Sequence, residues 1–215
     1  VGHLFTLEHR TFIHYHTKFG GKHMKISHTL TEVKEIAKTG KYDILPVSCE
    51  ILSDFITPIE AMRILQNVST HCYLLESAQA NEAWGRYTFL GYDPKLEINC
   101  IDGHMKLGKL SVETENPSEY IRQILSEYKS PKFDYLPSFT GGLVGYFSYD
   151  YLGYKEKSIR GKARDTEDFK DVDLMLFDKV IAFDNLCQKI ILIANMSLDA
   201  PETGYNKAIV ELKQL

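Results

Sequence analysis

The apolar residues of this chain recur at helical spacing in several segments. Residues 27–38 place their apolar side chains at three- and four-residue intervals, which predicts an amphipathic helix. A second helix is predicted to begin at Thr57 and Pro58, because the threonine hydroxyl can cap the helix and the proline suits its first turn. Two further helices are predicted over residues 117–129 and 201–215.

Short apolar segments bounded by turn residues predict strands between these helices. The pair Asp102-Gly103 predicts a tight hairpin turn. The pair Asp184-Asn185 predicts the turn of a longer hairpin, formed by residues 172–183 and 188–194. In that hairpin the alternation would place four apolar side chains on one face: Leu174, Leu176, Val180 and Ala182. The other predicted strands are 42–47, 71–77, 86–92, 94–101, 104–107 and 143–149.

Helices and strands occur in mixed order, and successive strands are joined by hairpin turns. This pattern is typical of an α+β fold with an antiparallel β-sheet and flanking helices. A chain of 215 residues that is 44% hydrophobic suits one domain with a substantial core. We expect residues 24–215 to form that domain.

Residues 1–23 contain five of the eight histidines and show no clear period. We interpret them as a leader or expression remnant outside the fold. A metal-binding arm is the alternative, because imidazole binds zinc, copper and nickel, but a His-x-His pair alone defines no tetrahedral site.

Composition excludes several classes of function. The net charge is −4 and the basic residues are scattered, which argues against a nucleic-acid surface. No apolar run approaches the roughly 20 residues that span a bilayer, and we see no secretory signal. Four widely spaced cysteines form no paired motif, which favours a reducing, cytoplasmic location over a disulfide framework: Cys49, Cys72, Cys100 and Cys187.

The stretch 72–94, CYLLESAQANEAWGRYTFLGYDP, holds the strongest candidate for a binding site. Its two consecutive leucines, Leu74 and Leu75, predict a strand covered on both faces. Glu76 and Ser77 then place a carboxylate and a hydroxyl at the strand end, and Arg86 offers a planar donor fork suited to a carboxylate. An acceptor for an ammonium group near a donor for a carboxylate is what an α-amino acid requires. A direct pair between Glu76 and Arg86 is the alternative.

Two other motifs give weaker indications of function. The glycines at 141, 142 and 145 lack the Lys-Ser/Thr of a phosphate loop and lead into a strand, so a close backbone approach explains them better. The acidic run 165–173 lacks the spacing of a calcium loop, and we predict no metal site in this chain.

Residues 24–215 resemble the N-terminal region of anthranilate synthase component I, the large chorismate-binding subunit. The resemblance rests on motifs that occur in family order: TLTEVKEIAKTGKYDILPV, DFITPIEAMRIL, LLESA, WGRYTFLGYDP, FTGGLVGYFSYDYLGY and DLMLFDKVIAFDNLCQKIILIAN. It implies the N-terminal part of the αββα sandwich of chorismate-utilising enzymes.

The resemblance also implies a feedback site for L-tryptophan. Glu76 and Ser77 would hold the polar end of the amino acid, with Leu75 beside them. Pro58 would lie against the indole, and Arg86 would lie near the rim. Trp84 is most simply a packing residue.

The catalytic residues of the family belong to a C-terminal chorismate-binding domain, and none of its motifs occurs in this sequence. We therefore expect no catalytic residue here, a chain that is inactive alone, and Mg²⁺ only in that separate domain. The whole enzyme, a lyase, would convert chorismate and ammonia to anthranilate and pyruvate in tryptophan biosynthesis. A glutamine amidotransferase subunit, component II, would supply the ammonia.

Two rival functions remain. Aminodeoxychorismate synthase component I, on the route to p-aminobenzoate, has a similar N-terminal region. A stand-alone tryptophan-binding module that acts through partners is the other.

Overall fold

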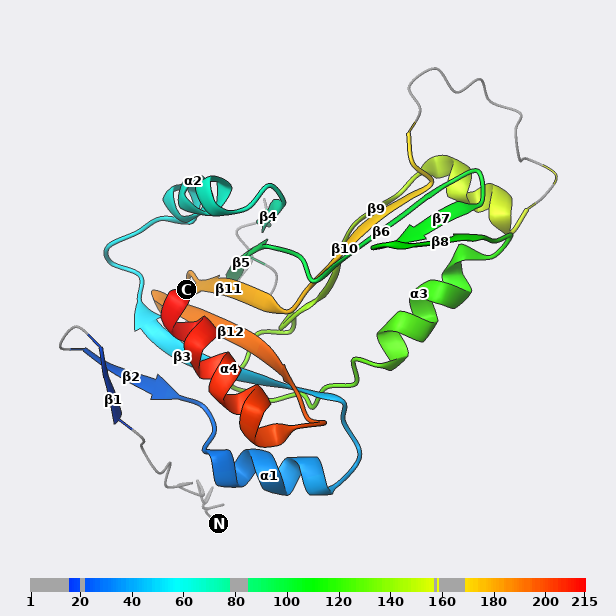
Figure 1. Ribbon diagram of the computed structural model, residues 1–215. Coiled ribbons are helices and arrows are strands. Elements are labelled where there is room, and N and C mark those ends of the chain that lie inside the picture. Colours follow the sequence, from blue (N-terminus) through cyan, green and yellow to red (C-terminus); the bar gives the residue numbers. More distant parts are fainter. Residues whose placement is uncertain (1–15, 20–21, 78–84, 157, 159–168) are drawn as a thin grey trace, which may run out of the picture.

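The computed structural model describes residues 16–19, 22–77, 85–156, 158 and 169–215. Its strands form two antiparallel sheets, and the helices lie against them, as Figure 1 shows. The α+β class predicted from the sequence is therefore confirmed. The larger sheet has seven strands and the smaller sheet has five.

The larger sheet has the strand order β1-β2-β3-β12-β11-β5-β4. Its strands are β1 (His16–Phe19), β2 (Lys22–Ile26), β3 (Ile44–Leu52), β4 (Cys72–Leu75), β5 (Tyr87–Tyr92), β11 (Lys179–Asp184) and β12 (Lys189–Ser197). The hairpin β1–β2 includes residues before Met24, so part of the segment interpreted as a leader lies at the edge of this sheet.

One face of the larger sheet packs against three helices. These helices are α1 (Leu30–Lys38), α2 (Pro58–Val68) and α4 (Pro201–Gln214). Alternate residues of β3, including Leu45 and Val47, point into this core and meet Val33 of α1 and Leu212 of α4. The other face packs against the segment that follows α3 (Pro117–Ser126), which contributes Phe133, Leu136 and Phe139.

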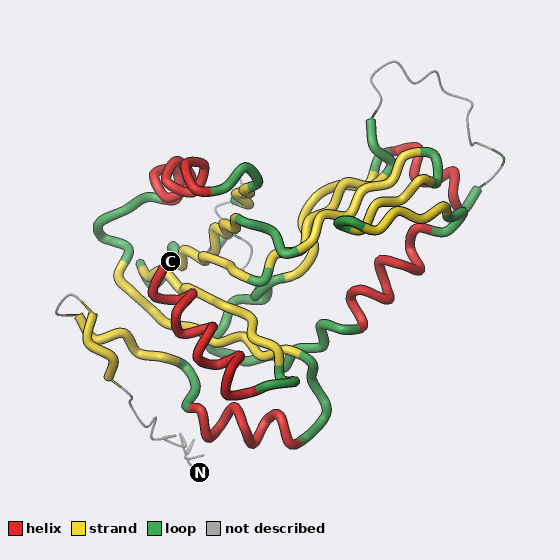
Figure 2. Tube along the Cα trace, in the orientation of Figure 1, coloured by secondary structure: helices red, strands yellow, loops and turns green. Residues whose placement is uncertain are grey.

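The smaller sheet has the order β8-β7-β6-β10-β9. Its strands are β6 (Leu96–Ile101), β7 (His104–Leu107), β8 (Leu110–Glu113), β9 (Gly142–Phe147) and β10 (Val172–Phe177). Ile98 and Val172 are fully buried there, and Ile121 of α3 packs against them together with tyrosines of a 3₁₀-helix, η1 (Tyr149–Tyr154). The tube in Figure 2 shows this sheet and α3 projecting from the layer of the larger sheet.

The prediction for the first arm of the long hairpin, residues 172–183, was wrong in one respect. The structure divides this segment at Asp178 into β10, in the smaller sheet, and β11, in the larger one. Asn195 holds the division: its backbone N–H and its side-chain amide both donate to the carbonyl of Asp178, at 2.8 and 3.0 Å. Leu174 and Leu176 therefore lie in a different sheet from Val180 and Ala182. Alternation continues across the break, so the sequence pattern alone did not reveal it.

Several element boundaries also differ from the prediction. Strand β3 continues to Leu52, five residues beyond the predicted 42–47, and β8 was not predicted. Asn116 precedes α3 but makes no capping bond to a backbone N–H, because its side-chain oxygen accepts from the Ser118 hydroxyl instead, at 2.7 Å. Among the described residues, no helix is long and apolar enough to cross a membrane.

Candidate functional site

The candidate site begins where β4 ends. Strand β4 pairs with β5 in antiparallel register, with Leu74 opposite Leu90 and Leu75 opposite Phe89. Leu74 packs against the helix-covered core, whereas Leu75 points to the opposite face and is 46% exposed. The predicted cover on both faces of this strand is therefore absent at Leu75 within the described residues. Glu76 and Ser77 follow, and both are exposed.

An aromatic surface lies beside Leu75 on the same face of the larger sheet. Phe89 is its cross-strand partner, and the ring of Tyr87 lies 5.8 Å from that of Phe89. Phe139 meets Phe89 edge to face at 5.6 Å, which is a favourable geometry for two aromatic rings. These rings and Leu75 present apolar surface of the kind that packs against an aromatic ligand.

Arg86 immediately precedes β5 and forms an ion pair that the sequence did not predict. Its Nη2 lies 2.6 Å from Oδ2 of Asp184, and its Nε donates to both carboxylate oxygens at 3.1 and 3.2 Å. The guanidinium also lies over the ring of Tyr87, 4.9 Å from its centre. Arg86 therefore pairs with Asp184 and not with Glu76, which has no ion-pair partner in the part of the chain that the structure describes.

Asp184 is the last residue of β11 and is only 3% exposed. Its Oδ1 accepts hydrogen bonds from the backbone N–H groups of Leu186 and Cys187 in the hairpin turn, at 3.1 and 3.0 Å. A buried carboxylate is costly unless it is paired and hydrogen-bonded, and Asp184 meets both conditions. The sequence identified Asp184 only as a turn residue. Aspartate is common in turns, so nothing in the pattern distinguished it from a solvated one.

Hydrogen bonding keeps both members of the pair, Arg86 and Asp184, in their charged forms. Burial works to raise the pKa of Asp184, but the hydrogen bonds from Arg86 and from the Cys187 backbone outweigh burial, and the pKa is lowered. The hydrogen bond to Asp184 raises the pKa of the Arg86 guanidinium above its ordinary value. The two opposite charges therefore persist at neutral pH.

Pro58 occupies the first turn of α2, as predicted. Thr57 caps this helix: its hydroxyl accepts from the N–H of Glu60 at 3.3 Å, and the Glu60 carboxylate accepts from the N–H of Thr57 at 3.0 Å. Helix α2 packs against β4 and β5 on the helix-covered face of the larger sheet (Figure 1), whereas Leu75 points to the opposite face. Trp84 lies outside the described residues.

Three of the cavities among the described residues lie away from these side chains. One, of about 390 Å³, separates α1 from the start of α4, and another, of about 330 Å³, lies at the β6–β7 turn. The third, of about 170 Å³, is lined by residues of β2, β3 and the segment after α3, including Ser48, Glu50 and Tyr135. Among the described residues, no three His, Cys, Asp or Glu side chains are grouped to hold a metal ion.

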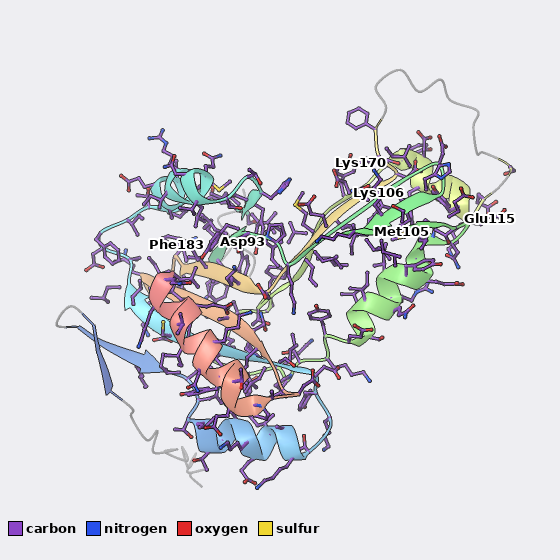
Figure 3. The ribbon with its side chains drawn as sticks, in the orientation of Figure 1. Asp93, Met105, Lys106, Glu115, Lys170 and Phe183 are labelled. Atoms are coloured by element: carbon purple, nitrogen blue, oxygen red, sulfur yellow. The ribbon has the colours of Figure 1, made fainter. Side chains whose placement is uncertain are left out.

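Figure 3 shows how the labelled side chains divide between the sheets. Phe183 lies on the larger sheet, and Met105 and Lys106 lie on the smaller one. Asp93, just after β5, pairs with Lys179 of β11 at 2.7 Å. The four cysteines are free thiols, and Cys49 and Cys100 are buried.

Comparison with known proteins identified relatives of this chain. It is 33% identical over 192 residues to anthranilate synthase component 1 of Acetivibrio thermocellus, an alignment that covers 87% of this chain and 38% of the relative. It is 35% identical over 182 residues to anthranilate synthase component 1 of Pseudomonas aeruginosa, covering 81% of this chain and 36% of the relative. A scan against protein-family models found no match.

Among solved structures, the chain is similar to anthranilate synthase component I from Streptococcus pneumoniae TIGR4. The sequences are 26% identical, the TM-score is 0.47, and the match covers 76% of this chain and 36% of that one.

The chain is therefore homologous to part of an enzyme subunit. That subunit is anthranilate synthase component 1, which confirms the resemblance inferred from the sequence motifs. The chain spans between a third and two fifths of the length of these curated relatives.

Proposed function

We propose that this chain is the N-terminal regulatory region of an anthranilate synthase component I and contributes the feedback site for L-tryptophan. The observation that carries the proposal is the exposed end of β4. There a carboxylate, Glu76, and a hydroxyl, Ser77, follow Leu75, which adjoins the aromatic surface of Tyr87 and Phe89.

The chemistry of these groups matches the three parts of a tryptophan molecule. The Glu76 carboxylate accepts hydrogen bonds from the ligand ammonium group, and the Ser77 hydroxyl bonds to its polar end. Leu75 and the neighbouring rings pack against the indole, whereas Pro58 starts the helix on the other face of β4. Arg86 carries the positive charge closest in sequence to these groups and faces the ligand carboxylate at the rim.

In the whole enzyme, a separate C-terminal domain would bind chorismate and Mg²⁺ and form anthranilate and pyruvate in the cytoplasm. The ammonia would come from a glutamine amidotransferase subunit. Tryptophan would inhibit by favouring an arrangement of the two domains that does not close on chorismate. It does so only to the extent that it binds that arrangement more tightly.

Calorimetric titration of the 215-residue chain with L-tryptophan tests the binding site, with D-tryptophan and L-phenylalanine as controls. Selective, saturable heat for L-tryptophan is expected, and Ser77→Leu should abolish it because the leucine fills the polar end of the site. Thr70→Leu, at an exposed position before β4, is the control substitution. Equal heats for the three ligands, or an unaltered titration of the Ser77 variant, would contradict the proposal.

Kinetics of the full-length subunit test regulation separately. Ser77→Leu should leave anthranilate formation intact while tryptophan no longer inhibits it, because the substitution lies outside the catalytic domain. Inhibition that persists in this variant would show that the feedback site lies elsewhere.

A further inference from the structure

Five hydrogen bonds converge on the buried carboxylate of Asp184. Three come from the Arg86 guanidinium and two from the backbone of the β11–β12 turn. Arg86 itself remains 36% exposed along its side chain. Asp184 thus anchors a solvent-accessible cation to the interior of the larger sheet.

This anchor uses one particular edge of the guanidinium. Nε and Nη2 donate to Asp184, and Nη2 also donates to the Cys187 thiol at 3.6 Å. Nη1 has no hydrogen-bond partner among the described residues. A guanidinium grips a carboxylate with two parallel bonds only when two adjacent nitrogens are available. The two edges that offer adjacent nitrogens are Nε with Nη2 and Nη1 with Nη2. Both include Nη2, which already donates to Asp184 and to the Cys187 thiol.

We propose that Asp184 is a positioning residue for the ligand site at the end of β4, holding Arg86 so that Nη1 alone is presented to a ligand carboxylate. This inference rests on the proposed function. It assigns Arg86 a single-ended contact with the ligand and places the residue that sets this contact on β11, about 100 residues further along the chain.

Two possible roles of Asp184 predict opposite changes in ligand affinity when its charge is removed. As a negative charge near a ligand carboxylate, Asp184 would weaken binding by repulsion, so its removal would tighten binding. As a positioning residue it strengthens binding, because a free Arg86 must lose side-chain freedom on meeting the ligand. The sign of the change in affinity therefore decides between the two roles.

The first variant is Asp184→Asn in the 215-residue chain. Its carbonyl oxygen can still accept from Leu186, Cys187 and Arg86 Nε, but its amide group cannot accept from Nη2, and the negative charge that holds the guanidinium is lost. L-Tryptophan affinity, measured by calorimetry, should fall about tenfold, the size expected when a charge-assisted hydrogen bond is lost. Unchanged or tighter binding would overturn the positioning role.

Arg86→Lys is the second variant, and it leaves Asp184 and its turn intact. Lysine keeps the charge but lacks the planar fork, so affinity should again fall about tenfold. In the double variant the affinity should equal that of Arg86→Lys alone, because both changes remove one interaction. Additive losses would contradict the inference. Asp173→Asn, which breaks the Lys170–Asp173 pair of the smaller sheet at 2.9 Å, is the matched control and should leave affinity unchanged.

A measurement without ligand separates this inference from the proposed function. The Nε–H proton of Arg86 should give a resolved NMR signal protected from solvent exchange in the natural chain, and that protection should weaken in Asp184→Asn, which removes the charge and one of the two acceptors of this N–H. If the natural chain does not bind tryptophan, the proposed function fails. If it binds, yet the Nε–H signal is unprotected or Asp184→Asn binds as well, the positioning role fails alone.

Discussion

At the scale of single residues, Gly145 and His28 have structural requirements that the sequence pattern alone does not reveal. Gly145 in β9 has φ +151° and lies against the backbone of Asp173 in the neighbouring strand β10. His28 is buried at 8% exposure between Ser27, whose hydroxyl lies 3.0 Å from Nδ1, and Tyr135, whose hydroxyl lies 3.3 Å from Nε2. Both positions fix local geometry far from the candidate site.

Gly145→Ala should destabilise the chain strongly. A Cβ there would overlap the carbonyl oxygen of Asp173, and the backbone angle is unfavourable for any L side chain. We expect a loss of about 3 kcal/mol in the free energy of unfolding, measured by urea denaturation. Gly40→Ala is the control: φ is +61° and no atom lies within 4 Å of the added Cβ, so the loss should be about 1 kcal/mol. Equal losses would contradict this account.

His28 should make stability depend on pH in the acidic range. Burial lowers its pKa from 6.5, although the nearby Glu32 carboxylate partly opposes this. The unfolded chain then binds the proton more readily, so His28 contributes its full stability above about pH 6.5 and loses it as pH falls toward the folded pKa. Thermal unfolding followed by circular dichroism should show this decline.

His28→Gln should flatten that part of the profile, because glutamine does not titrate. His104, with a ring that is 71% exposed, provides the control, and His104→Gln should preserve the shape of the profile. A decline that survives in His28→Gln would assign it to another group.

At the scale of elements, local signals set where helices begin, and neighbouring strands set where sheets begin and end. Helices α1 and α2 both start with a complete capping box, at Thr29 and Thr57. The capping hydroxyl of Thr57 was recognised in the sequence because a capping box needs only residues three apart. The division at Asp178 was missed, since it depends on hydrogen bonds from Asn195 to the Asp178 carbonyl.

Thr57→Ala should destabilise the chain by about 1 kcal/mol, the usual cost of losing an N-cap hydroxyl. Thr57→Ser retains the acceptor for the Glu60 N–H and should lose less than half of that amount. Chemical denaturation of the three proteins measures the difference. A serine variant as unstable as the alanine variant would show that the threonine methyl group, and not the cap, stabilises this end of α2.

At the scale of the whole molecule, two sheets with separate cores share one chain. The larger sheet has buried clusters on both faces, and the smaller sheet has its own cluster with α3. The candidate site lies on the larger sheet, at the ends of β4, β5 and β11. The chain corresponds to only part of its relatives, and among its described residues no group of metal ligands forms.

Under the proposed function, the purified 215-residue chain should form no anthranilate from chorismate, ammonia and Mg²⁺, because the proposed catalytic domain is separate. Anthranilate fluorescence measures the product directly, and a full-length component I serves as the positive control. Product formed by the chain in proportion to its concentration would contradict the proposed division of roles.

The sequence by itself determined the elements whose causes are local. The start of α2 follows from its capping residue, the turn at Asp102-Gly103 follows from its own dihedral preferences, and Leu75, Glu76 and Ser77 follow one another along the chain. The motifs also indicated the resemblance to anthranilate synthase component 1, because their order is a property of the sequence. These features need no knowledge of what lies opposite them.

Only the tertiary structure decided which side chains and strands contact one another. It assigned Arg86 to Asp184, left Glu76 and Ser77 exposed, and divided one predicted strand between two sheets. The physical reason is that hydrogen bonds and burial depend on groups far apart in the sequence. Asp184 and Arg86 meet because β5 and β11 pair, and no local pattern of apolar and polar residues encodes which strands become neighbours.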